Sequence, residues 1–185
     1  ILIGLVGSEM CIRDRHMALE KFAAEVRKEG LDWAELTEEE RNRIIDSCLD
    51  QVSADYGNTI LKSSARNEYM IERTRRILRR TVWALQEQLK HGAFRPEGFE
   101  VRFQGGRIDR VDIMEEPENN RVYVKVIDYK TGNTSFDLLA LYHGLQLQLM
   151  VYLDGALQVE KRKYPDREIV PAGVFYYNVK DPMIC

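Results

Sequence analysis

The stretch Arg121-Val-Tyr-Val-Lys-Val-Ile-Asp-Tyr-Lys130 decides the fold, because apolar residues alternate along it with period two. In a β-strand, alternate side chains share one face. One face of this strand therefore carries three valines, and the same face ends in Asp128 and Lys130. The valines predict that the face is buried, so a carboxylate and an ammonium group close a core-facing row.

The segment before it predicts a second strand that brings another carboxylate to the same place. Arg107 to Met114 forms this strand, and the polar residues 115–120 form a turn that leads into Arg121. Asp109 shares a face with Val111 and Ile113. If the two strands pair as a hairpin, Asp109 and Asp128 converge at one end of the sheet.

Two core-facing carboxylates repel each other and are costly to desolvate unless a cation compensates them. Oxygen ligands favour Mg²⁺ or Mn²⁺, and the carbonyl of Tyr129 is a further ligand candidate. Lys130 would orient an attacking water and offset charge that develops on a phosphate. The alternative is a buried ion pair, Asp128–Lys130 or Asp109–Arg110, without a catalytic role.

The segments around this hairpin predict an α/β fold with a small mixed sheet. Phe99–Phe103 reads as a short strand that is followed by a turn at Gln104-Gly-Gly106. A long helix is expected from Phe136 to Lys161, loosened at Gly144, and a buried strand from Pro171 to Val179. A strand, a crossover helix and a strand predict a parallel pair.

The first half of the chain predicts three helices. The first runs from His16 to Glu29 and ends at Gly30. Thr37-Glu-Glu-Glu40 has the form of a capping box that opens the second helix, on whose apolar stripe Cys48 is interpreted as a core residue. The third runs from Ser63 or Ser64 to Gly92 and carries six arginines: Arg66, Arg73, Arg75, Arg76, Arg79 and Arg80. These arginines would contact phosphate, or they form a solvated face paired with acids such as Glu68 and Glu72.

Composition excludes few functions. The chain has 185 residues, 44% of them hydrophobic and 31% charged, with a net charge of −3, so nucleic-acid binding would need a local basic patch. The three dispersed cysteines argue against a disulfide framework and favour a cytoplasmic protein. The apolar start is too short to span a membrane. Residues 1–15 are interpreted as a translated sequencing adapter, the alternative being a natural extension. We expect residues 16–95 to form a helical lead-in and residues 96–185 an α/β core, truncated at its C-terminus.

Three ordered motifs carry a family resemblance. They are Gly106-Arg-Ile-Asp-Arg-Val-Asp112, Val126-Ile-Asp-Tyr-Lys-Thr-Gly132 and Gly144-Leu-Gln-Leu-Gln-Leu-Met-Val-Tyr-Leu153. Together they resemble the RecB-like branch of the PD-(D/E)XK nucleases, and most closely the AddB-type nuclease domains of bacterial AddAB helicase–nucleases. The resemblance implies a restriction-endonuclease-like core and a metal-dependent DNA exonuclease that acts in the repair of double-strand breaks. It also implies single strands as substrate and an AddA-like helicase–nuclease subunit as partner.

The resemblance assigns roles to individual residues. Asp109 and Asp128 match the metal-binding acids, Lys130 the catalytic lysine, and Gln148 and Tyr152 a Q-x-x-x-Y element that contacts substrate or braces the site. Gln146 lies on another side of the helix and is a weaker candidate. His16 matches an upstream histidine that can bind the metal. The expected DNA-contacting residues are Arg66, Arg73, Arg76 and Arg107.

Two departures from the family pattern keep other functions open. Only Gln104-Gly105 separates Phe103 from the Gly106 motif, where the family has a longer segment. None of Cys11, Cys48 and Cys185 matches the family's iron–sulfur ligands, so no 4Fe–4S cluster is expected in this chain. The alternatives are a catalytically impaired DNA-binding or subunit-docking module, and a standalone RecB-like nuclease.

Overall fold

The computed structural model describes residues 3–55, 65–130, 135 and 137–179. The polypeptide divides into two compact units. The described residues up to Gly92 make up the first unit, and those from Ala93 to Val179 make up the second. No helix in the described part of the chain is long and apolar enough to cross a membrane.

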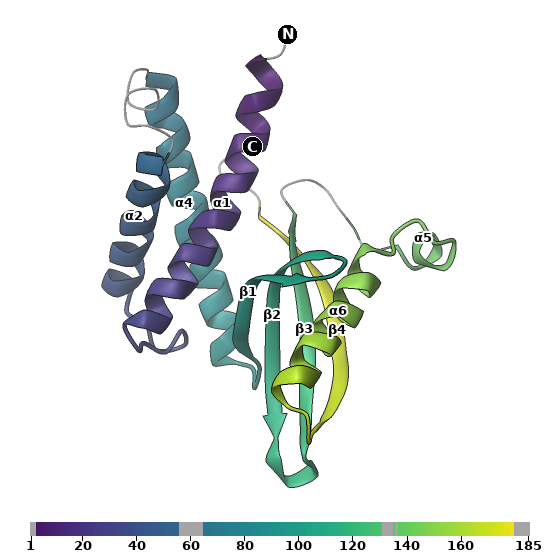
Figure 1. Ribbon diagram of the computed structural model, residues 1–185. Helices are drawn as coiled ribbons and strands as arrows, with labels where there is room; N and C mark the ends of the chain where they lie inside the picture. The colour runs from purple at the N-terminus through teal and green to yellow at the C-terminus, as the bar shows by residue number, and fades with distance from the viewer. Residues whose placement is uncertain (1–2, 56–64, 131–134, 136, 180–185) are drawn as a thin grey trace. The chain divides into compact units, whose positions relative to one another are not determined.

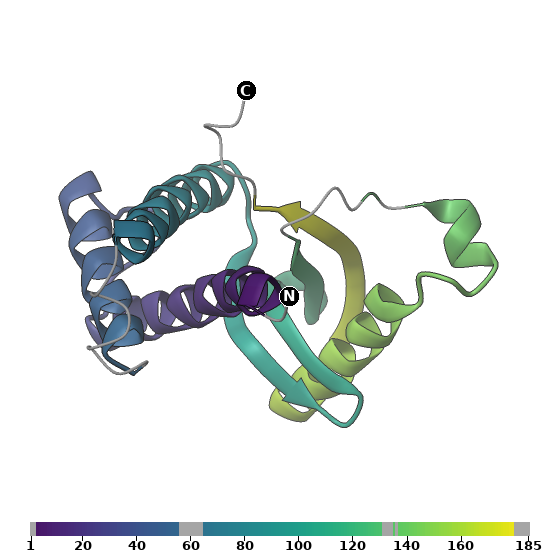
Figure 2. The ribbon, with the colours of Figure 1, turned by 90° about the horizontal axis from the view of Figure 1, so that it is seen from above.

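In the described part of the first unit, three helices lie alongside one another in both views (Figures 1 and 2). They are α1 (Ile3–Lys28), α2 (Glu38–Asp55) and α4 (Ala65–Lys90). Each of these helices buries a row of apolar residues, and on α2 this row includes Cys48, as predicted. The buried residues include Leu19, Phe22, Val26, Ile44, Ile45, Cys48, Leu49, Ile77, Leu78, Val82 and Leu85.

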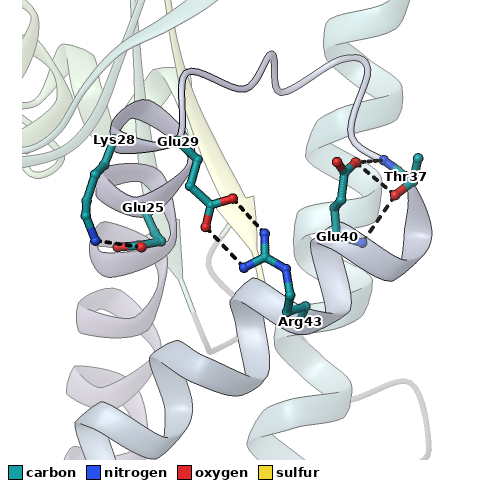
Figure 3. A network of polar contacts seen from close by, with 6 residues as sticks. All are labelled: Glu25, Lys28, Glu29, Thr37, Glu40 and Arg43. Atoms are coloured by element: carbon teal, nitrogen blue, oxygen red, sulfur yellow. Dashed lines mark hydrogen bonds and ion pairs between the residues drawn. The ribbon is translucent and has the colours of Figure 1, made fainter.

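The turn between α1 and α2 confirms the capping prediction (Figure 3). The Thr37 amide donates to Oε2 of Glu40 at 2.9 Å, and the Glu40 amide donates to Oγ1 of Thr37 at 3.2 Å. This reciprocal pair satisfies two amides at the start of α2. Gly30, with φ of +67°, ends the preceding helical segment, and Arg43 of α2 is bidentate to Glu29 at 3.1 and 2.6 Å.

A four-stranded mixed sheet of order β1-β2-β3-β4 forms the second unit. Its strands are β1 (Arg95–Phe103), β2 (Gly106–Glu116), β3 (Arg121–Lys130) and β4 (Glu168–Asn178), with the short 3₁₀ helix η1 (Pro117–Asn119) between β2 and β3. β1, β2 and β3 pair antiparallel in sequence order, and β4 pairs parallel to β3. The predicted fold class, hairpin and parallel pair are therefore confirmed.

The prediction of one helix from Phe136 to Lys161 is wrong in one respect, because this segment contains two helices. α5 (Leu138–Tyr142) ends before Gly144, and α6 (Gln148–Lys163) begins after it. Gly144 has φ of +76°, a left-handed conformation that stops a helix and that glycine adopts without strain. Because of this break, Gln148 is the first residue of α6 and lies at the N-terminal end of the helix.

α6 lies against one face of the sheet (Figures 1 and 2). Its Ala156 is packed in a core with Ile108, Val111, Ile113, Val122, Val124 and Val126. A Cβ atom added at Gly155 would come within 2.4 Å of the Phe103 ring. Glycine at this position therefore lets α6 approach the β1–β2 hairpin closely.

The shortened segment before Gly106 forms a tight hairpin. β1 and β2 pair up to Phe103↔Gly106, so Gln104 and Gly105 alone make the turn. β1 also begins four residues earlier than predicted, at Arg95. Its register shifts between Pro96 and Gly98, and this irregularity hides the period-two pattern in the sequence.

Candidate active site

Asp109 marks the point where β2 and β3 separate. Their backbone pairing runs from Glu116↔Arg121 to Arg110↔Ile127 and is not continued to Asp109. Instead, Oδ2 of Asp109 accepts the amide of Tyr129 at 2.8 Å. The carboxylate of Asp109 thus lies at the C-terminal end of β3, beside the residue that follows Asp128.

Asp128 and Lys130 form an ion pair on the last residues of β3. Nζ of Lys130 is 2.7 Å from Oδ2 of Asp128, and the two side chains are 25% and 5% exposed. Burial alone would lower the pKa of Lys130, but the hydrogen bond and the charge of Asp128 outweigh it and the pKa is raised. The charge of Asp109 raises it further. Lys130 is therefore a protonated ammonium group held among carboxylates.

Gln148 and Tyr152 extend this arrangement from α6. Oε1 of Gln148 accepts from Nζ of Lys130 at 3.2 Å, and Nε2 of Gln148 donates to the Tyr152 hydroxyl at 2.8 Å. The Tyr152 ring packs edge-on against Phe103, with centroids 5.9 Å apart. A continuous polar chain thus runs from Asp128 through Lys130 and Gln148 to Tyr152. Gln146 lies apart from it and accepts the amide of Asp137 ahead of α5.

Glu100 is a further candidate site residue, and it was not predicted from the sequence. The register pairs on either side of it, Phe99↔Arg110 and Val101↔Ile108, place it opposite Asp109. Carboxylate oxygens of Glu100 and Asp109 lie within 4.8 Å of each other. Glu100 has φ of +51°, and its side chain is 6% exposed and forms an ion pair with Arg107. Only the hairpin register reveals this position, because a glutamate between Phe99 and Val101 looks solvent-facing in the sequence.

The neighbouring Arg110 pairs with Asp112, whereas one alternative drawn from the sequence paired it with Asp109. Its Nε and Nη2 atoms donate to the two carboxylate oxygens of Asp112 at 2.5 and 2.9 Å, and both side chains are almost fully buried. Nζ of Lys125 lies 3.0 Å from Oδ2 of Asp112. Adjacent residues of a strand point to opposite faces, whereas residues two apart share one. Arg110 therefore meets Asp112 on the face opposite to that of Asp109.

The remaining predicted residues lie in several places. His16 is on α1 in the helical unit, and its role as a metal ligand stays a prediction. Arg73 and Arg76 are on α4, the side chain of Arg66 lies outside the described residues, and Arg107 is on β2, 55% exposed. The Tyr129 amide is the group that Asp109 binds, and the Tyr129 carbonyl as a metal ligand stays a prediction. Thr131 and Gly132 lie outside the described residues.

The donor set fits a hard divalent cation. Carboxylate oxygens of Glu100 and Asp109 lie within 4.8 Å of each other, and Asp128 lies on β3, where the β2–β3 register continued by one residue would place it opposite Asp109. Like charges this close disfavour joint ionisation unless a cation neutralises them. Carboxylate and carbonyl oxygens are the ligands that Mg²⁺ and Mn²⁺ prefer.

Comparison with known proteins identifies the superfamily of this chain. The model of the PD-(D/E)XK nuclease superfamily matches residues 13–184, and the chain belongs to this superfamily. Bacterial proteins named as one subunit of an ATP-dependent helicase/deoxyribonuclease are similar to it in sequence. The one from Lachnoclostridium phytofermentans is 46% identical over 177 residues, and the one from Alkaliphilus metalliredigens is 37% identical over 189 residues.

Each of these alignments covers 91% of the chain but only 15% or 16% of the relative. The chain thus spans about a sixth of the length of the curated relatives it matches. The alignment over 189 residues is longer than the 185 residues of the chain, so that relative carries additional residues within the matched region.

Proposed function

We propose that this chain is the metal-dependent DNA-hydrolysing domain of a helicase–nuclease subunit that processes DNA ends in recombinational repair. The observation that supports it most directly is the Asp128–Lys130 ion pair at the end of β3, beside the opposed carboxylates of Asp109 and Glu100. The names of the relatives combine helicase and deoxyribonuclease activity. The proposed substrate is a single DNA strand delivered by a partner helicase–nuclease subunit.

In this proposal Asp109 and Asp128 hold Mg²⁺ or Mn²⁺, with Glu100 as the added ligand. When bound, the cation supplies Lewis-acid stabilisation of charge on the phosphate and lowers the pKa of water. The Tyr129 carbonyl and His16 are further predicted ligands. The Tyr129 amide holds the Asp109 carboxylate in place by donating to its Oδ2 atom.

The chain's own side chains orient and stabilise the reacting groups. A water oxygen attacks phosphorus and the P–O3′ bond breaks, so the products carry a 5′-phosphate and a 3′-hydroxyl. Lys130 is protonated and 25% exposed, which suits an ammonium group that hydrogen-bonds the attacking water and offsets negative charge on the phosphate. Gln148 fixes the Lys130 ammonium group, and the Tyr152 hydroxyl fixes Gln148.

Cleavage of a labelled single-stranded oligonucleotide tests the proposal. We expect the chain to cleave it with Mg²⁺ and not with EDTA. Asp128→Asn should slow cleavage about 100- to 1000-fold, the cost typical of one lost electrostatic group at a reacting centre. Asp154→Asn is the matched control, because Asp154 on α6 binds the nearby Gln158 at 2.7 Å and its replacement should be neutral.

Two results would contradict the proposal. A wild-type chain that is folded and inactive with Mg²⁺ would favour the alternative of an impaired DNA-binding or docking module. Equal rates for the wild type and Asp128→Asn would remove the role of the β3 carboxylate. For the longer protein, an AddA-like partner would be tested by copurification of the two subunits.

A further inference from the structure

The arginine side chains of α4 that the structure describes fall into two groups. Arg75 and Arg79 belong to the first group, because both bind Asp46 of α2. Nε of Arg75 is 3.1 Å from the Asp46 carboxylate, and Nη2 of Arg79 is 2.9 Å from it. Arg75 also pairs with Glu72 at 2.6 Å. These two arginines hold α4 against α2, and their charges are neutralised by the carboxylates of Asp46 and Glu72.

The second group lies on a different face of the same helix, together with two aromatic residues. Tyr69, Arg73, Arg76, Arg80 and Trp83 follow one another at intervals of four, three, four and three residues, which places them on one side of a helix. We call this face the α4 stripe. Tyr69 and Trp83 are 57% and 48% exposed. The buried stripe of α4, which includes Leu78 and Leu85, lies on the opposite side.

The α4 stripe is positively charged in a chain whose net charge is −3. Among the residues that the structure describes, Arg76 and Arg80 form no ion pair. The acids at its margins are compensated elsewhere. Glu72 pairs with Arg75 at 2.6 Å, and Glu87, one turn beyond Trp83, pairs with Lys90 at 3.0 Å. Arg80 is exposed, whereas Arg76 is half-buried and its Nε atom is buried without a hydrogen-bond partner, so an anionic ligand would meet the outer part of the Arg76 guanidinium group.

The arginine and aromatic residues of the α4 stripe indicate the kind of ligand it would bind. Arginine guanidinium groups match phosphate oxygens. Exposed indole and phenol rings stack on the faces of unpaired bases, which a duplex keeps within its own stack. The stripe spans 15 residues of helix, or about 20 Å at 1.5 Å per residue. A lone basic stripe would fit any polyanion, but aromatic rings near both its ends favour a single nucleic-acid strand.

We infer that the α4 stripe is a binding site for single-stranded DNA, with Arg76 and Arg80 on phosphates and Trp83 and Tyr69 stacked on bases. The inference deepens the proposed function, since it rests on a DNA strand as the substrate. It adds the aromatic residues Tyr69 and Trp83 to the phosphate contacts considered from the sequence. Of those six arginines, it assigns Arg75 and Arg79 to the packing of the helices instead.

Two double variants of equal charge test the arginines. Binding of a fluorescent single-stranded oligonucleotide is measured by anisotropy in EDTA, so that it is independent of hydrolysis. Arg76→Gln/Arg80→Gln should weaken binding at least 10-fold. It should also reduce the slope of log K against log salt by about 1.4, since each phosphate contact on a single strand contributes about 0.7. Arg75→Gln/Arg79→Gln removes the same charge, and should weaken binding less than 3-fold.

Equal weakening by the two double variants would overturn the inference, because it would show a nonspecific effect of net charge. Unchanged binding in Arg76→Gln/Arg80→Gln would overturn it as well. Thermal unfolding of both variants checks that α4 is still folded. Because the assay contains no metal ion, a chain that binds DNA through the stripe and never cleaves it would refute the proposed activity alone.

Tryptophan fluorescence tests the stacking separately. The chain has two tryptophans, so Trp33→Phe leaves Trp83 as the reporter. We expect its emission to be quenched by a single strand and not by the same sequence as a duplex. Trp83→Ala should weaken binding of the single strand about 5-fold or more. Emission that does not change at saturating single strand, or that changes equally with the duplex, would refute a stacking role, and capture of a protein segment would become the better use of this face.

Discussion

Asp109 and Asp112 lie three residues apart on β2 and have opposite surroundings. Asp112 is fully buried between two cations, Arg110 and Lys125, so its charge is neutralised within the sheet. Asp109 is half-buried, accepts a backbone amide and faces Glu100, which is another acid. One short motif therefore supplies both a structural ion pair and a carboxylate suited to a ligand. The two carboxylates have different surroundings because alternate residues of a strand point to opposite faces of the sheet.

The largest effect is expected from replacing Asp112, the structural carboxylate of this pair. Asp112→Asn deprives the buried Arg110 guanidinium of the anion it binds, which typically costs about 3–5 kcal/mol. Asp109→Asn keeps an oxygen that can accept the Tyr129 amide and removes repulsion from Glu100, so the metal-free chain should unfold within about 1 kcal/mol of the wild type. Urea unfolding in EDTA measures both.

Adding Mg²⁺ to the same measurements sharpens the contrast. An ion that binds only the folded chain stabilises it by mass action, about 2.7 kcal/mol at 100 times its dissociation constant. We expect this gain in the wild type and not in Asp109→Asn. A similar gain in both proteins would show that Asp109 is not a ligand, whatever the result for Asp112.

A smaller effect, on the cleavage rate, is expected from replacing the α6 residues that contact Lys130 directly or through a neighbour. Gln148→Ala removes the acceptor that orients the Lys130 ammonium group and should lower the cleavage rate about 10-fold, a fraction of the 100- to 1000-fold typical of a group at the reacting centre. Tyr152→Phe keeps the ring against Phe103 and should cost less. Single-turnover cleavage measures both, and a larger loss in Tyr152→Phe would reverse the assigned order of the polar chain.

The smallest signal is expected from a pH titration of Tyr129, because it amounts to the absorbance of one tyrosinate. Burial raises the pKa of Tyr129 to about 12, although the charge of Arg110 opposes the shift. The neutral phenol is favoured in the folded chain, so this contribution to stability is complete below pH 10 and is lost as the pH rises from 10 to about 12. Absorbance at 295 nm at pH 11 should be nearly equal in the folded wild type and Tyr129→Phe. After unfolding in urea the wild type should gain one more tyrosinate, and a gap already present in the folded proteins would contradict the shift.

Much of this arrangement was predictable from local patterns. The bounds of β3 agree with the prediction because a polar turn precedes a strand with alternating apolar residues. The capping pair Thr37 and Glu40 correctly predicts the start of α2. The split between α5 and α6 was underestimated, because a glycine inside an apolar-periodic segment does not show whether its φ is positive. Glu100 could not be found, because its place depends on the β1–β2 register, which spans two strands and a bulge.

The close approach at Gly155 has a consequence for how this sequence can change over generations. The Phe103 ring occupies the space that any larger residue at position 155 would need. A substitution at Gly155 is therefore tolerated only together with a smaller residue at position 103, and a smaller residue at position 103 frees position 155. Since the Phe103 ring also packs against Tyr152, we expect replacements at positions 103 and 155 to occur together.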